Sequence, residues 1–348
     1  MAGEKINAVN YRRIDRLLVL AALFAAGVEW VRADEPVHKV VWQRVREDGL
    51  VASFLRPKGE VARPAIMVVG GSEGGLKSAE GLAYRFAERG WAALAVAYFG
   101  VEGLPPQLAN IPLESFDTAA TWLRRQPLIE PGGLAIAGVS RGGELALLVA
   151  SRNPAFTRVV AWVPSHVGWG PVGPFKDSTV SAWTVGGRPL PFVPHVREPD
   201  YSARPYRGTP DFLADLQQGQ TVEAAAIPVE KIRGAVLLLS GEDDQVWPST
   251  AMSRLVMTRL AAAQHPYRFE HVSFPDAGHL IAPGSDPGLI EAKHPTGVVM
   301  AFGGTKAGNR AAQEKGWAKV REFLRADSGA AESAGVRSAK NPKPGVSP

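Results

Sequence analysis

Residues 134–150 read Leu134-Ala-Ile-Ala-Gly-Val-Ser-Arg-Gly-Gly-Glu-Leu-Ala-Leu-Leu-Val-Ala150, and this stretch decides the fold. It begins as an apolar run with the length of a buried strand and ends in a helical pattern. Between the two lies a G-x-S-x-G turn, Gly138-Val-Ser140-Arg-Gly142. Such a turn strains the serine backbone, needs glycine on either side, and places the hydroxyl at a helix N-terminus. The pattern predicts either a nucleophilic Ser140 or an ordinary glycine-rich turn.

Alternating strands and helices continue on both sides of this turn. We expect strands at 38–56 (an antiparallel pair), 65–70, 91–99, 134–139, 158–163, 235–240 and 267–274. We expect helices at 78–89, 113–125, 249–264 and 309–326. Strands that alternate with helices pair in parallel through right-handed crossovers. The sequence therefore predicts an α/β fold with a doubly wound, mostly parallel sheet.

Three segments depart from this alternation. Residues 1–33 combine a cationic start with the apolar run Leu17–Val28 and small or aliphatic residues before Asp34, which predicts a signal peptide or an N-terminal anchor. Residues 164–230 form a long connection rich in Pro, Gly and Trp, typical of a lid or specificity loop. Residues 327–348 have the composition of a disordered tail. The predicted catalytic-type domain is therefore 34–326.

Composition excludes several classes of function. The 348 residues are 45% hydrophobic, and the formal net charge of +5 comes largely from the chain ends, so no basic stripe indicates nucleic-acid binding. The chain has no cysteine, which excludes disulfides, thiolate metal sites and a cysteine nucleophile. No metal-ligand spacing is present, and we expect neither a metal nor another cofactor.

A nucleophilic serine needs a base, and the base needs a carboxylate that orients it. Two loops that follow expected strands supply these groups. Gly241-Glu-Asp-Asp244 precedes Pro248, and Asp244 is our choice because it lies deepest in the loop, with Asp243 as the alternative and Glu242 expected in solvent. Pro275-Asp-Ala-Gly-His279 presents a histidine after a sharp glycine turn.

The order Ser140, Asp244, His279 is the order of the triad in α/β-hydrolases. We expect His279 to take the Ser140 proton and return it to the leaving group, and Asp244 to fix the imidazole tautomer. The N–H of Arg141 is the first expected oxyanion donor. The second comes from the glycine-rich loop after the 65–70 strand, with Ser72 preferred and Glu73 as the alternative.

The sequence also resembles the C-terminal catalytic domain of the acyl-CoA thioesterase and bile acid-CoA:amino acid N-acyltransferase (BAAT) family, from about residue 65 to 324. The motifs that carry the resemblance are 70–76 (GGSEGGL), 92–99 with 103–105, 138–145 (GVSRGGEL), 227–230, 241–247 (GEDDQVW), 275–279 (PDAGH) and 303–305. The resemblance implies an α/β-hydrolase fold with Ser140, Asp244 and His279 as the triad. It also implies hydrolysis rather than transfer, because the N-acyltransferase branch typically carries cysteine as nucleophile.

Three hypotheses of function follow. The first is a serine hydrolase of acyl esters or thioesters that acts on a small-molecule substrate. The second is an acyltransferase that passes the acyl group to an amine or alcohol, and the third is a hydrolase-fold protein that binds a ligand without turnover. The signal-like segment predicts a periplasmic or secreted protein with no membrane span after signal removal; without a functional signal the chain would be cytoplasmic.

Overall fold

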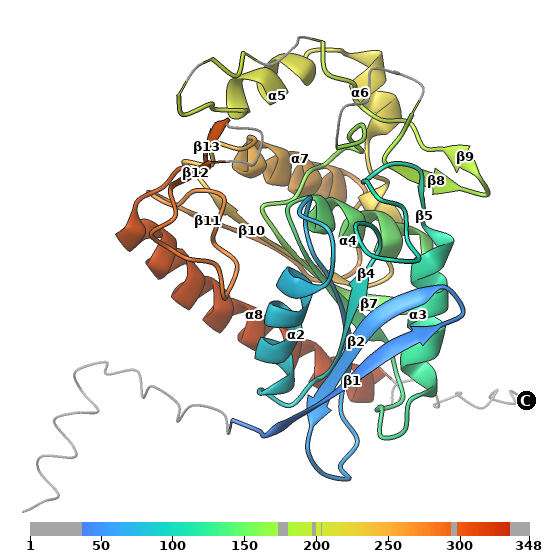
Figure 1. The fold of residues 1–348 in the computed structure, drawn as a ribbon. Helices are drawn as coiled ribbons and strands as arrows, with labels where there is room; N and C mark the ends of the chain where they lie inside the picture. Colours follow the sequence, from blue (N-terminus) through green and yellow to red (C-terminus); the bar gives the residue numbers. More distant parts are fainter. Residues whose placement is uncertain (1–36, 173–179, 197–199, 203, 294–297, 335–348) are drawn as a thin grey trace, which may run out of the picture. The chain divides into compact units, whose positions relative to one another are not determined.

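The computed structural model describes residues 37–172, 180–196, 200–202, 204–293 and 298–334, which form the body drawn in colour in Figure 1. The predicted signal segment 1–33 therefore lies outside the described residues. So do residues 173–179, 197–199 and 203 of the long connection, and residues 335–348 of the predicted tail.

An eight-stranded sheet forms the centre of the described body, in the order β1-β2-β4-β3-β6-β7-β10-β11. Its strands are β1 (Val40–Glu47), β2 (Leu50–Pro57), β3 (Ala65–Val69), β4 (Ala92–Ala97), β6 (Leu134–Val139), β7 (Phe156–Trp162), β10 (Ala235–Gly241) and β11 (Phe269–Phe274). β1 and β2 pair antiparallel with each other, and β2 pairs antiparallel with β4. All further pairs are parallel. The predicted doubly wound, mostly parallel sheet is confirmed.

Helices cover both faces of this sheet (Figure 1). The helices are α2 (Lys77–Ala87), α3 (Glu114–Arg125), α4 (Arg141–Arg152), α7 (Ser249–Ala262) and α8 (Lys306–Ala334). α2 and α8 share one hydrophobic core with the sheet, whereas α3, α4 and α7 share the other. Since both faces are buried, β3 and β10 are apolar without alternation, as the continuous runs in the sequence indicated.

The β1–β2 hairpin closes through Asp48 and Gly49, which have φ values of 52° and 75°. Positive φ at both central residues is the geometry of a type I′ turn, and an Asp-Gly pair adopts it readily. The predicted antiparallel pair at 38–56 is therefore a hairpin with a tight turn. β1 is an edge strand, and its outward residues are exposed, including Trp42.

The long connection 164–230 folds into small elements next to the sheet. They are β8 (Trp183–Val185), β9 (Arg188–Pro189), α5 (Thr209–Asp215), α6 (Gln220–Ala225) and the 3₁₀ turn Val229–Lys231. β8 pairs with β9 and with β5 (Ile111–Pro112), which gives a second small sheet. Trp169 and Trp247 are buried together in a separate hydrophobic cluster that joins this connection to the loop after β10.

The C-terminal helix differs from the prediction at both ends. α8 begins at Lys306 and runs to Ala334, whereas the predicted helix covered 309–326. A short hairpin, β12 (Glu291–Lys293) and β13 (Val299–Ala301), precedes it. Among the described residues, no helix combines the length and the apolar character that crossing a bilayer requires.

Candidate active site

Ser140 lies between β6 and α4 with φ 57° and ψ −120°, outside the regions that L-residues normally occupy. Its neighbours must be glycines. A Cβ on Gly138 would collide with the carbonyl of Gly142, and a Cβ on Gly142 would collide with the carbonyl of Gly70. This backbone strain is of the kind that is retained at functional sites. As the first residue of α4, Arg141 has an N–H without an acceptor inside its helix.

Asp244 and His279 form a buried pair. The Nδ1 of His279 lies 2.9 Å and 3.0 Å from the two carboxylate oxygens of Asp244. A carboxylate only accepts hydrogen bonds, so Nδ1 carries the proton and Nε2 is left as the acceptor. Asp244 also accepts from the hydroxyl of Ser249 at 2.6 Å and from the N–H of Val246 at 3.0 Å, which fixes its orientation.

The alternatives to Asp244 lie elsewhere. Asp243 accepts a hydrogen bond from the N–H of Gly304 at 2.8 Å and another from the side chain of Gln245. Glu242 accepts from the hydroxyl of Ser273 at 2.6 Å. Of the three acidic residues in this loop, Asp244 is the one that contacts the imidazole.

A continuous set of contacts connects the serine turn with the histidine loop. The N–H of Ser140 donates to the carbonyl of Trp162, at the end of β7. The next carbonyl, of Val163, accepts from the indole N–H of Trp247 at 3.0 Å. That indole packs edge-on against His279, with ring centroids 6.0 Å apart. Ser140, Asp244 and His279 therefore follow the carboxyl ends of β6, β10 and β11 at one edge of the sheet.

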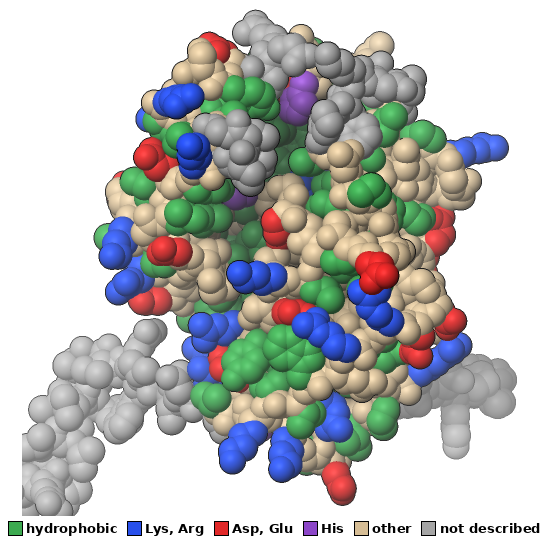
Figure 2. Space-filling view, in the orientation of Figure 1, with side chains coloured by type: hydrophobic (Ala, Val, Ile, Leu, Met, Phe, Trp, Pro, Cys, Tyr) green, Lys and Arg blue, Asp and Glu red, His purple; other side chains and the backbone are tan. Residues whose placement is uncertain are grey.

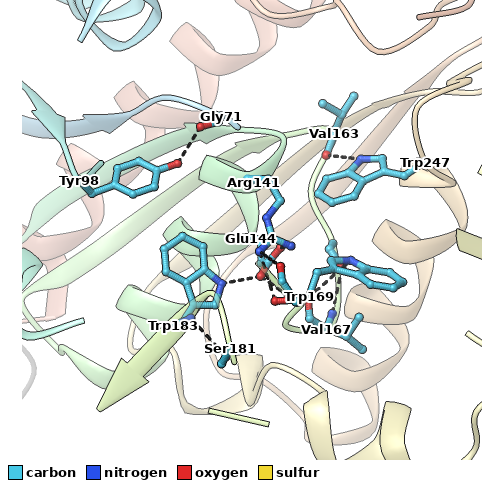
Figure 3. A network of polar contacts seen from close by, with 12 residues as sticks. Gly71, Tyr98, Arg141, Glu144, Val163, Val167, Trp169, Ser181, Trp183 and Trp247 are labelled. Atoms are coloured by element: carbon cyan, nitrogen blue, oxygen red, sulfur yellow. Dashed lines mark hydrogen bonds and ion pairs between the residues drawn. The ribbon is translucent and has the colours of Figure 1, made fainter. Parts of the chain in front are cut away.

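The loop after β3 lies directly against the serine turn. A methyl group at Gly71 would lie 3.5 Å from the Cβ of Ser140. The hydroxyl of Tyr98 lies 2.8 Å from the carbonyl oxygen of Gly70. It lies 2.9 Å from the carbonyl oxygen of Gly71 (Figure 3). The N–H of Gly71 donates to the carboxylate of Glu73. Ser72, the preferred second donor, is exposed in this loop.

A buried ion pair anchors the long connection to α4. Arg141 and Glu144 form a 2.8 Å salt bridge, with their side chains only 5% and 0% exposed. Arg141 donates to the carbonyls of Trp169 and Gly170, at 3.2 Å and 3.0 Å. Glu144 accepts from the indole N–H of Trp183 at 2.6 Å and from the backbone N–H of Trp169 at 3.1 Å (Figure 3). Four groups of the connection are thus bound to the first turn of the serine helix.

Burial dominates the electrostatics of this pair. Burial raises the pKa of the Glu144 carboxyl, whereas Arg141 and the hydrogen bonds from the connection lower it. Burial also lowers the pKa of the Arg141 guanidinium, and Glu144 opposes that shift. Each charge therefore relies on the other for its stability inside the protein. From the sequence we predicted a role for the backbone of Arg141 and for neither side chain, although the i, i+3 spacing of Arg141 and Glu144 on a helix was a signal.

Elsewhere the described residues offer little chemistry of this kind. No group of His, Asp and Glu side chains among them is arranged to hold a metal ion. A surface depression of about 680 Å³ lies at the far end of α4, lined by Arg152, Lys231 and Arg233 among others. Cations at the C-terminal end of a helix complement its dipole, so we assign this depression no catalytic part.

The fold and the strained serine turn define an α/β-hydrolase. Residues 111–330 match the family model described as "BAAT / Acyl-CoA thioester hydrolase C terminal". The chain belongs to this family, which confirms the family predicted from its motifs.

Curated relatives agree with this assignment. The chain is 29% identical over 290 residues to acyl-coenzyme A amino acid N-acyltransferase 2 of Mus musculus, covering 81% of this chain and 64% of that protein. It is 28% identical over 284 residues to acyl-coenzyme A thioesterase 1 of Rattus norvegicus, covering 80% and 64%. The match thus spans less than two thirds of the length of these relatives.

The fold also resembles solved structures. A candidate dienelactone hydrolase from Klebsiella pneumoniae superposes with a TM-score of 0.52 at 18% sequence identity, covering 82% of this chain and 98% of that one. At that identity the likeness shows the fold alone.

Proposed function

We propose that this protein is a serine hydrolase that cleaves acyl thioesters or esters, in the manner of an acyl-CoA thioesterase, through an acyl-enzyme on Ser140. The observation that carries the proposal is the buried Asp244–His279 pair at the same sheet edge as the strained serine turn. The relatives named for acyl-coenzyme A thioesterase and N-acyltransferase activity support an acyl substrate.

The proposed mechanism gives each of the three residues one role. The Ser140 oxygen attacks the acyl carbonyl while Nε2 of His279 takes its proton, and Asp244 stabilises the resulting imidazolium. The tetrahedral intermediate then collapses, the C–S or C–O bond breaks, and His279 returns the proton to the leaving thiol or alcohol. Water repeats the sequence on the acyl-enzyme, which releases the carboxylic acid and free Ser140.

Two backbone donors would stabilise the oxyanion of each tetrahedral intermediate. The N–H of Arg141 has no acceptor in its own helix, and Ser72 lies in the loop that packs against Ser140. We keep Glu73 as the alternative to Ser72. Figure 2 shows this end of the body hollowed, with hydrophobic and histidine side chains inside, which suits an apolar acyl group.

The experiment that tests the proposal compares matched acyl-CoA thioesters with simple oxygen esters over a range of acyl lengths. Ser140→Ala is the control, and we expect it to lose about 10⁴-fold or more in kcat. A fluorophosphonate probe should label the wild type and leave Ser140→Ala unlabelled. An active Ser140→Ala variant, or a wild type that neither reacts with the probe nor turns over any acyl substrate, would refute the proposal.

Transfer to an amino acid is the second candidate function, because one relative is named as an amino acid N-acyltransferase. Both reactions use the same acyl-enzyme and differ in whether water or an amine attacks it. Adding an amino acid such as glycine during turnover separates them, since an acyltransferase forms the N-acyl product and a hydrolase forms only the free acid. The serine nucleophile favours the free acid.

The location of the protein stays a proposal based on its N-terminal sequence. We propose that residues 1–33 direct export to the periplasm or the medium, with cleavage before Asp34. Cell fractionation and N-terminal sequencing of the mature protein test this. Recovery of the intact chain in the cytoplasm would contradict it and would favour acyl-CoA as the substrate.

A further inference from the structure

Tyr98 is a buried side chain at the end of β4 that the mechanism above does not use. Its hydroxyl lies within hydrogen-bond distance of two consecutive carbonyls, of Gly70 and Gly71. Carbonyl oxygens only accept, so the tyrosine must be the donor and must be protonated. Burial raises the pKa of Tyr98 well above its ordinary value, and nearby Glu73 adds to that shift. The hydroxyl therefore remains a donor throughout the neutral pH range.

The orientation of two carbonyls determines the orientation of the N–H groups that follow them. In a trans peptide the C=O and the N–H of the same peptide point in opposite directions. Because the Gly70 and Gly71 carbonyls point at Tyr98, the N–H groups of Gly71 and Ser72 point away from it. Two successive N–H groups on one side form a concave anion site. The first of them already holds the carboxylate of Glu73.

The same loop packs on the serine turn from the other side. A methyl group at Gly71 would lie 3.3 Å from the carbonyl of Val139 and 3.5 Å from the Cβ of Ser140. The Gly70 carbonyl lies against Gly142, which leaves no room for a side chain there. In the described part of the chain, the Ser72 N–H has no protein acceptor. The loop thus carries an unused donor one residue after the glycine that packs against Ser140.

We infer that Tyr98 is a positioning residue that holds the Ser72 N–H in place as the second oxyanion donor. The inference rests on the proposed function. It chooses between Ser72 and Glu73, because the Tyr98 hydroxyl fixes the peptide that carries the Ser72 N–H and not the next one.

The tyrosine ring is itself held firmly, which makes its hydroxyl a suitable anchor. It packs against Phe99, Phe116 and Trp183, with ring centroids 5.1, 5.9 and 5.8 Å away. Trp183 is in turn bound to Glu144 of the serine helix. The loop and the first turn of α4 therefore share one rigid support, and they carry the two donors between them.

The test removes the hydroxyl and keeps the ring, with Tyr98→Phe in the full chain. We expect kcat to fall about 10- to 100-fold, which is no more than the fall in kcat that removing an oxyanion donor itself causes. KM should change less than about threefold. Affinity for an alkylboronic acid should fall in parallel with kcat, because its serine adduct carries the negative oxygen. Tyr267→Phe is the matched control, since that tyrosine is exposed beside the depression to which we assign no catalytic part, and it should leave both values unchanged.

A second pair of variants removes the amide hydrogen itself. Ser72→Pro should lower kcat at least as much as Tyr98→Phe, and Tyr98→Phe should add little in that background. A larger loss from Glu73→Pro than from Ser72→Pro would overturn the assignment of the donor.

Different results would refute the role of Tyr98 and the proposed function. If the wild type reacts with the fluorophosphonate probe and Tyr98→Phe keeps wild-type kcat and boronic acid affinity, the role of Tyr98 is refuted alone. If the wild type neither reacts with the fluorophosphonate probe nor binds the boronic acid, the proposed function is refuted instead. Unchanged kcat with a raised KM would show that Tyr98 shapes substrate binding, which also overturns the inference.

Discussion

The buried Arg141–Glu144 pair allows a prediction about stability that does not depend on catalysis. Glu144→Gln keeps an oxygen that can accept from Trp169 and Trp183. It removes the negative charge and turns the oxygen that faces Arg141 into an NH2 group, which cannot accept from the guanidinium. Arg141 then stays charged and unpaired in the interior, 5% exposed. Removing one partner of a buried pair costs about 3–5 kcal/mol, a large share of the roughly 5–15 kcal/mol that stabilises a typical protein.

The converse variant, Arg141→Met, should be costly for a different reason. Glu144 would remain buried without its counter-charge, and burial would raise its pKa further until it takes up a proton. The double variant Arg141→Met/Glu144→Gln removes both charges and keeps the acceptor for the two tryptophans. We therefore expect its loss of stability to be smaller than the sum of the two single losses by about 2 kcal/mol or more.

Urea denaturation followed by tryptophan fluorescence measures the four proteins of this cycle. A 4 kcal/mol loss should move the midpoint by about 1 to 1.5 M if the slope is about 3 kcal/mol per molar urea. The same cycle on the more exposed pair Arg259–Glu230 is the control, with an expected coupling below about 1 kcal/mol. Additive losses at Arg141 and Glu144, within about 0.5 kcal/mol, would refute the reasoning.

Two further predictions concern a glycine and a histidine. Gly138→Ala places a Cβ against the carbonyl of Gly142 and should lower both the melting temperature and the activity. Gly81→Ala in α2 meets no neighbouring atom and should stabilise the protein by about 0.5–1 kcal/mol. Equal melting temperatures for the two variants would contradict this prediction. Burial lowers the pKa of His166 from 6.5 to about 4, so between these values the unfolded chain binds a proton that the folded chain excludes. Stability is thus fully present above about pH 6.5 and falls toward pH 4. His166→Asn should make the melting temperature depend less on pH over that range, as thermal denaturation at several pH values would measure. Burial also lowers the pKa of His271 to about 4, so part of the pH dependence should remain.

The central sheet could be predicted because its signal is local. β6 has the predicted bounds, Leu134–Val139, since an apolar run between a glycine turn and a polar loop has one reasonable interpretation. The short strands β5 and β8 gave no such signal. Ile111 pairs with Trp183 across a long stretch of chain, and a two-residue strand exists only because its partner is present. The extension of α8 to Ala334 was missed because small residues are compatible with both helix and tail.

The residues of the candidate site likewise differ in whether local sequence could predict them. Loop order and glycine spacing selected Ser140, Asp244 and His279, and the structure brings the last two into contact. Their catalytic roles stay a prediction. Tyr98 and Glu144 could not be selected, because nothing in a single sequence shows that a tyrosine after one strand reaches a loop after another. Buried polar contacts between distant segments depend on the completed fold.

The order of the strands in the sheet has a consequence for synthesis of the chain. β10 is buried along its whole length, yet β11, which covers its outer edge, and α8, which covers one face, are made later. Until they emerge from the ribosome, the nascent chain presents an apolar strand with an unpaired edge, which is a template for aggregation. Truncation before β11 should therefore give insoluble protein, and expression should improve with chaperones that shield nascent chains.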